Sequence, residues 1–154
     1  MRVIAVILTL ALLGSTYIVA KEANDEKQAA TATEFRQSIF KLIRSNAGPI
    51  GGMARGNVAF DNDIVIKNAT RINQLSQMIP DYFVINTSKF SVETEALAKI
   101  WDNKSDFEEK AGALQSASAA LLETAQAGNE ADTKKAIGAI FRTCKSCHDE
   151  YKKD

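Results

Sequence analysis

The chain has 154 residues, which suits one ordinary domain and is short for two. Its 19 Lys and Arg balance 19 Asp and Glu, so no basic excess exists to hold a phosphate backbone, which argues against nucleic acid as a partner. One His and two Cys are too few for a four-ligand protein zinc site, and a single His without G-x-S-x-G argues against a hydrolase triad.

Residues 1–20 have the pattern of a secretory signal peptide. Arg2 supplies a positive start, Val3–Leu13 is nearly unbroken apolar sequence, and small residues precede Ala20. The apolar core is shorter than the ~20 residues of a spanning helix, which favours cleavage near Ala20 over an uncleaved membrane anchor. We therefore expect an exported domain, residues 21–154, with no stable membrane anchor once the signal is removed.

Helical spacing of apolar residues predicts two helices in the first half of this domain. Lys21–Thr33 is polar and is expected to be a frayed lead-in, with the first helix beginning at Glu34. After a Gly-rich loop, Asp61 or Asn62 is the expected N-cap of the second helix. Pro80 is expected to end that helix, because proline disfavours helical backbone at the preceding residue.

Two more helices are predicted in the second half. The third is expected to open at Ser91, to be interrupted at Trp101–Lys104 and to end at Gly128-Asn129. Its apolar seam is Phe107, Ala111, Leu114, Ser118, Leu121 and Ala125. The fourth helix is expected from Glu130 to Lys152. Its stripe is Ile137, Phe141, Cys144, His148 and Tyr151. Four amphipathic helices predict an all-α, antiparallel four-helix bundle with up-down-up-down topology.

The fourth helix carries Cys144-Lys145-Ser146-Cys147-His148, which is the C-x-x-C-H signature of c-type haem attachment. Each thiol adds across a vinyl group of haem, and the adjacent imidazole becomes an axial ligand of the iron. Cys144 and His148 are four apart and share a helix face, with Cys147 to one side. A thioredoxin-like redox pair is the alternative, but it calls for a βαβ context that the sequence does not contain.

The sixth position on the iron has few candidate ligands. The chain has no second His, and apart from Met1 its methionines are Met53 and Met78. Either could bind iron as a sixth ligand. With neither bound, the iron is five-coordinate and one face is open to a small gas.

The sequence resembles the cytochromes c prime, the class II c-type cytochromes, whose members are themselves known four-helix bundles. The resemblance is carried by the C-terminal place of the motif and by Phe35–Leu42, followed by Gly48-Pro49-Ile50-Gly51 and Phe60-Asp61. It extends over essentially the whole of residues 21–154.

The resemblance implies roles for three residues of the first helix. Arg36 and Gln37 match residues near the haem propionates, where a guanidinium suits carboxylates. Phe40 matches the residue over the open face of the iron, and because Phe has no lone pair for iron it favours five-coordinate, high-spin haem. The resemblance also implies a periplasmic, monohaem protein that binds nitric oxide and carbon monoxide, exchanges electrons with a redox partner protein and forms a homodimer.

Three other functions compete with this interpretation. One is a six-coordinate, low-spin electron carrier that uses Met53 or Met78. Another is a peroxidase-like enzyme, but the segment near Phe40 offers only Gln37, Ser38 and Lys41 as acid–base groups, so we expect a non-enzymatic protein. The third is a haem-free bundle whose Cys pair is a redox switch.

Overall fold

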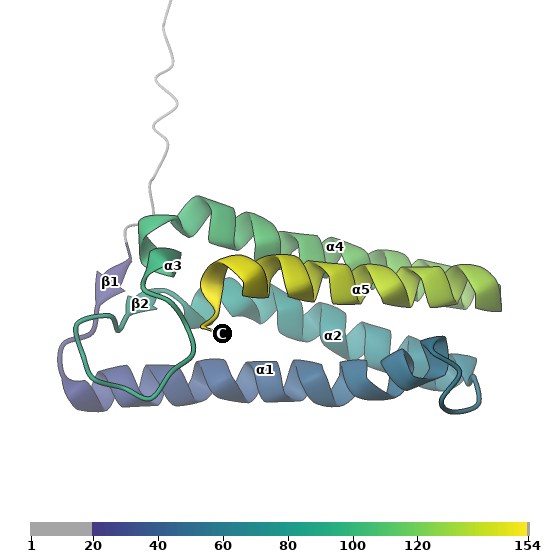
Figure 1. Ribbon diagram of the computed structural model, residues 1–154, viewed down its shortest axis with the longest axis horizontal. Helices are drawn as coiled ribbons and strands as arrows, with labels where there is room; N and C mark the ends of the chain where they lie inside the picture. The colour runs from purple at the N-terminus through teal and green to yellow at the C-terminus, as the bar shows by residue number, and fades with distance from the viewer. Residues whose placement is uncertain (1–19, 154) are drawn as a thin grey trace, which may run out of the picture.

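The computed structural model describes residues 20–153, and Figure 1 shows its long helices running side by side. The predicted signal peptide lies outside the described residues, apart from Ala20. The elements in chain order are β1 (Lys21–Glu22), α1 (Glu26–Ala54), α2 (Asn62–Tyr82), β2 (Ile85–Asn86), α3 (Lys99–Asp102), α4 (Lys104–Gln126) and α5 (Glu130–Tyr151). Helices α1, α2, α4 and α5 form the predicted antiparallel four-helix bundle. No helix between residues 20 and 153 has both the length and the apolar composition needed to cross a membrane.

Helix α2 packs against both α1 and α4, and α5 packs against α4. The predicted seam of the third helical region is confirmed, because its members are the buried residues of α4. These are Phe107, Ala111, Leu114, Ser118, Leu121 and Ala125. Gly128 follows with a positive φ of 78° and ends α4 as expected.

Helix α1 begins eight residues earlier than predicted, at Glu26. The Asp25 carboxylate caps it by accepting from the Gln28 amide at 2.7 Å, and the Gln28 side chain accepts from the Asn24 amide at 2.6 Å. This reciprocal pair resembles a capping box and satisfies amides that a helix start leaves free. The expectation of a frayed lead-in over Lys21–Thr33 is therefore wrong, and Ala29 in that stretch is fully buried.

Helix α2 is capped as predicted, since the Asp61 carboxylate accepts from the Ile64 amide at 3.0 Å. Its predicted end at Pro80 is wrong, because α2 continues to Tyr82 with the proline in its last turn. Ile79 and Phe83 are both buried on either side of Pro80. Their packing against the core outweighs the local preference of proline.

The third helical region does not open at Ser91. Residues 87–98 instead form a segment that crosses α1 in Figure 1, which we call the crossing segment. Gln37 of α1 donates to the Glu93 carbonyl at 3.0 Å, and Ala96 forms an antiparallel bridge with Lys152 at the end of α5. The predicted interruption near Trp101 is confirmed, because α3 and α4 are separated at Asn103.

Helices α1 and α5 approach closely at Gly51. A Cβ atom at this position would lie 2.6 Å from Cζ and 2.9 Å from Cε2 of Phe141. Only glycine leaves room for that ring. The close approach lies toward the C-terminal end of α1, and the C-x-x-C-H motif follows Phe141 along α5.

Candidate haem site

Helix α5 places the three motif side chains in its C-terminal part. The Asn129 side chain caps the helix by accepting from the Asp132 amide at 3.1 Å. Cys144 and Cys147 are free thiols, half-buried, and pack against the hydrophobic core. His148 lies at the surface, with its ring partly covered. Two thiols and an imidazole therefore share one stretch of a rigid helix, as the sequence predicted.

The surroundings of these groups keep them uncharged near neutral pH. Burial raises the pKa of Cys144, and it raises the pKa of Cys147 to about 11 although the Lys110 ammonium opposes the shift. Burial lowers the pKa of His148, and the neighbouring Lys152 lowers it further. A neutral imidazole has the lone pair that a metal needs.

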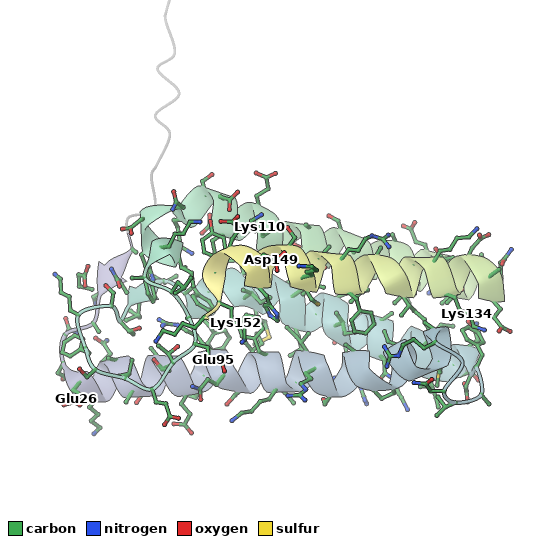
Figure 2. All side chains as sticks on the ribbon, viewed as in Figure 1. Glu26, Glu95, Lys110, Lys134, Asp149 and Lys152 are labelled. Carbon is green, nitrogen blue, oxygen red and sulfur yellow. The ribbon has the colours of Figure 1, made fainter. Side chains whose placement is uncertain are left out.

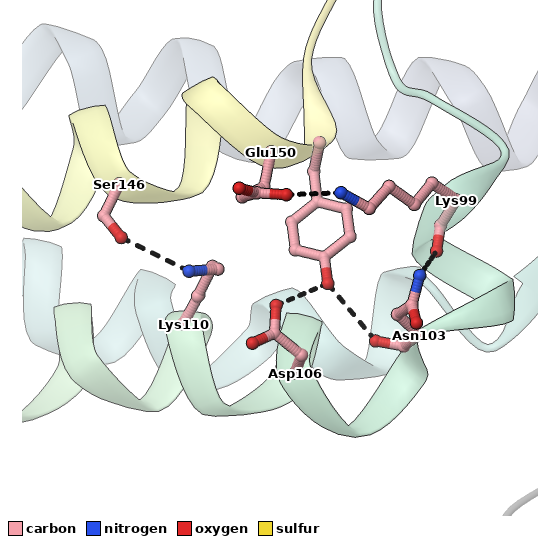
Figure 3. A network of polar contacts seen from close by, with 7 residues as sticks. Lys99, Asn103, Asp106, Lys110, Ser146 and Glu150 are labelled. Atoms are coloured by element: carbon pink, nitrogen blue, oxygen red, sulfur yellow. Dashed lines mark hydrogen bonds and ion pairs between the residues drawn. The ribbon is translucent and has the colours of Figure 1, made fainter.

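The C-terminal end of α5 is held by contacts with the crossing segment and with α4. Lys152 Nζ lies 3.1 Å from Glu95 Oε2 of the crossing segment, and Figure 2 shows the two side chains facing each other near α1. On the α4 side, the Tyr151 hydroxyl donates to Asp106 Oδ2 at 2.5 Å (Figure 3). These contacts hold the last turn of α5, which carries His148.

Burial raises the pKa of Tyr151, and the hydrogen bond to Asp106 raises it further. Figure 3 also shows Lys99 paired with Glu150 and Lys110 beside Ser146. Sequence reasoning placed Tyr151 on the helix stripe and missed this network, because Asp106 lies 45 residues away in the chain.

Two of the three exposed phenylalanines among the described residues, Phe40 and Phe141, are candidates for contact with a bound group. Phe40 of α1 is 36% exposed and Phe141 of α5 is 37% exposed. Phe141 belongs to the same helix as the thiols, three residues before Cys144. Two half-buried thiols, one imidazole and exposed aromatic rings suit a flat apolar group that carries two vinyl arms and a metal. Residues 20–153 contain no group of three His, Cys, Asp or Glu that could hold a metal ion by themselves.

Arg36 is 3% exposed, and its guanidinium donates to the last residue of α2 and to the segment after it. Nε donates to the Tyr82 carbonyl at 2.7 Å, Nη1 donates to Thr87 Oγ1 at 3.0 Å, and Nη2 donates to the Ile85 carbonyl. Burial lowers the pKa of Arg36 to about 10, which leaves it charged at neutral pH. Gln37 is exposed and donates to the crossing segment. The propionate roles of both residues stay predictions.

The two candidate sixth ligands lie in different places. Met53 is buried near the C-terminal end of α1, about 20 Å along the helix axis from Phe40. Met78 lies on α2 and is 39% exposed. The two methionines therefore lie on different helices, α1 and α2.

Comparisons with known proteins agree with this geometry. Residues 31–152 match the family model described as Cytochrome C'. A cytochrome c' from Rhodopseudomonas palustris is 33% identical over 149 residues, which cover 97% of this chain and 94% of that protein.

Two solved structures are similar over most of the chain. Cytochrome c prime from Shewanella frigidimarina is 38% identical with a TM-score of 0.76, covering 82% of this chain and 97% of that one. A nitric oxide complex of a mutant cytochrome c prime from Alcaligenes xylosoxidans is 27% identical with a TM-score of 0.73, covering 82% of this chain and 96% of that one.

Proposed function

The chain belongs to the cytochrome c prime family, and on that premise we propose that it is a periplasmic, monohaem c-type cytochrome whose five-coordinate, high-spin iron binds nitric oxide and carbon monoxide. Electron transfer with a partner protein is its second role. The observation that carries the proposal is the constellation on α5: two half-buried free thiols three residues apart, followed directly by the imidazole of His148.

Cys144 and Cys147 would hold one haem through two thioether bonds. In each addition the S–H bond would break, the sulfur would bond to one vinyl carbon and the hydrogen to the other, so no external oxidant would be needed. His148 would hold the iron from one side. When bound, haem would supply an iron that can bind a diatomic gas.

The absence of a hydrogen-bond donor on the Phe40 side chain would determine which gases bind. Phe40 has neither a lone pair for iron nor a hydrogen-bond donor. Two polar groups next to it are already engaged, since Ser38 donates to the Glu34 carbonyl and Gln37 donates to the Glu93 carbonyl. Bound dioxygen carries negative charge and depends on a donor, whereas nitric oxide and carbon monoxide depend on one less. With Ser38 and Gln37 engaged, the exposed Lys41 is the one acid–base candidate left from that set, and this supports a binding role over peroxidase-like catalysis.

The α1–α2 surface supports the expected homodimer. Phe35 and Leu42 of α1 are each 52% exposed, and Met78 of α2 is also exposed. Apolar side chains of this size are costly to leave in water and favour a partner surface. We therefore place the contact between two copies on α1 and α2.

Absorption spectra of the protein exported with haem-attachment machinery test the coordination. We expect a broad high-spin ferrous Soret band that sharpens and shifts with carbon monoxide. Sharp low-spin bands that carbon monoxide does not move would contradict the five-coordinate proposal and favour a sixth ligand from Met53 or Met78. A near-infrared Met–iron charge-transfer band would point the same way.

The mass of the denatured protein tests attachment and export together. We expect residues 21–154 plus one haem. A mass equal to the bare chain would favour the haem-free redox-switch alternative, and retention of residues 1–20 would contradict signal cleavage.

A further inference from the structure

Phe83, directly after α2, is the centre of an aromatic cluster. It is 2% exposed. Its ring centroid lies 4.6 Å from that of Phe107, 6.5 Å from that of Trp101 and 6.2 Å from that of Phe40. The Arg36 guanidinium carbon stands 4.9 Å from the centre of the Phe83 ring and 5.1 Å from that of Trp101. Phe83 thus joins a buried cation to the exposed ring of Phe40.

The backbone that carries Phe83 has unusually complete hydrogen bonding. Every carbonyl from residue 82 to residue 86 accepts a hydrogen bond from a distant part of the chain. Arg36 donates to Tyr82 and Ile85, the Trp101 indole donates to Phe83 at 3.1 Å, and the amides of Lys21 and Ala23 donate to Val84 and Asn86 at 3.0 and 2.9 Å. A backbone bonded at each carbonyl has few alternative conformations of low energy.

We propose that Arg36 and Phe83 are positioning residues for Phe40, and that they set how readily a gas reaches the open face of the iron. Arg36 clamps the backbone on both sides of Phe83, and the Phe83 ring restrains the Phe40 ring through their edge contact. This inference rests on the proposed function. It gives Arg36 a task besides the propionate contact implied by family resemblance, because three of its five N–H groups donate to Tyr82, Thr87 and Ile85.

The restraint matters because Phe40 is partly exposed. An exposed side chain changes rotamer within picoseconds to nanoseconds, whereas a packed aromatic edge holds one orientation. A Phe40 ring held in one orientation blocks access to the iron, whereas a ring that changes rotamer more often lets a ligand pass more often. The planar fork of Arg36 is needed for its three acceptors, and a Lys at this position can reach fewer of them.

Carbon monoxide association with the ferrous haem-loaded protein, followed by flash photolysis, tests the proposal. We expect Phe83→Leu and Arg36→Gln each to speed association by about two- to tenfold, the factor that corresponds to the loss of one aromatic pair. In a Phe40→Ala background neither change should alter the association rate further, because the ring that they position is absent. If Phe83→Leu does not fold, Phe83→Met, whose unbranched side chain adapts to irregular space, serves in its place.

A second measurement is independent of gas binding. Trp101 is the only Trp of the chain, so its indole N–H gives one identifiable resonance in the diamagnetic ferrous carbon monoxide form. We expect slow exchange of this proton with solvent, faster exchange in Arg36→Gln and an intermediate rate in Arg36→Lys. Leu121→Ala, a buried change at the far end of α4, is the control: it lowers stability without changing the association rate or the exchange.

The outcomes separate this inference from the proposed function. If Phe40→Ala itself leaves association unchanged, Phe40 does not guard the iron and the distal assignment fails. If Phe40→Ala speeds association but Phe83→Leu and Arg36→Gln do not, the positioning role is overturned and the gas site stands. An Arg36→Gln effect that persists undiminished in the Phe40→Ala background also overturns it, because Arg36 then acts by another route.

Discussion

Gly51→Ala tests the close approach of α1 to α5 beside the haem site. In the interior of a helix, Ala is favoured over Gly by about 1 kcal/mol. At Gly51, however, the new methyl group would lie 2.6 Å from Cζ of Phe141. Overpacking of this kind costs about 1 to 3 kcal/mol. The net expectation is a loss of roughly 0 to 2 kcal/mol in the free energy of unfolding.

Gly112→Ala in α4 is the matched control. A Cβ atom there meets nothing within 4 Å, so the full gain of about 1 kcal/mol is expected. Urea denaturation of the two haem-loaded variants, compared with the parent protein, measures the difference. Adding Phe141→Ala removes the obstructing ring, and in that background Gly51→Ala is expected to stabilise like the control. If Gly51→Ala alone stabilises as much as Gly112→Ala, the helices do not approach as closely as described and the reasoning is refuted.

Three further predictions concern the site and the surface. Replacing both Cys144 and Cys147 by Ala should let acid–acetone extraction remove all haem, as measured by the mass and colour of the pellet; retained colour would contradict thioether attachment. Because the pKa of Tyr151 is raised in the folded state, only the unfolded chain loses the phenol proton just above pH 10, so stability falls as pH rises beyond about 10. Tyr151→Phe should lack this extra fall between pH 9 and 11 in thermal melts, and an unchanged pH profile would argue against the Asp106 hydrogen bond. Leu42→Glu should convert the proposed homodimer to monomers in sedimentation without altering the haem spectrum, whereas an unchanged dimer would place the interface elsewhere.

Local patterns determined the helices. The seam from Phe107 to Ala125 could be predicted because a stripe that repeats every 3.6 residues has to face a neighbour, whichever neighbour that is. The start of α1 was equally local. Asp25 and Gln28 are spaced as a capping pair, and that signal was present in the sequence but missed.

Local patterns predicted the wrong helix boundaries where segments distant in the chain meet. Ser91 and Thr94 have the composition of a helix start, yet residues 91–97 are not helical, and residues 95–97 pair with the end of α5. Pro80 has the composition of a helix end, yet packing of the neighbouring core carries α2 to Tyr82. Both outcomes depend on contacts between residues far apart in the chain, and local sequence patterns do not predict such contacts.

The site also contains residues that local spacing predicts and residues whose positions depend on tertiary contacts. The chemistry of Cys144, Cys147 and His148 depends on spacing within one turn of helix, so the sequence by itself predicts covalent haem attachment. The place of Arg36 depends on acceptors 46 to 51 residues away, which lie beside its guanidinium only after α1 and α2 have packed. A buried guanidinium needs hydrogen-bond acceptors, and only the tertiary structure decided which oxygens accept from Arg36.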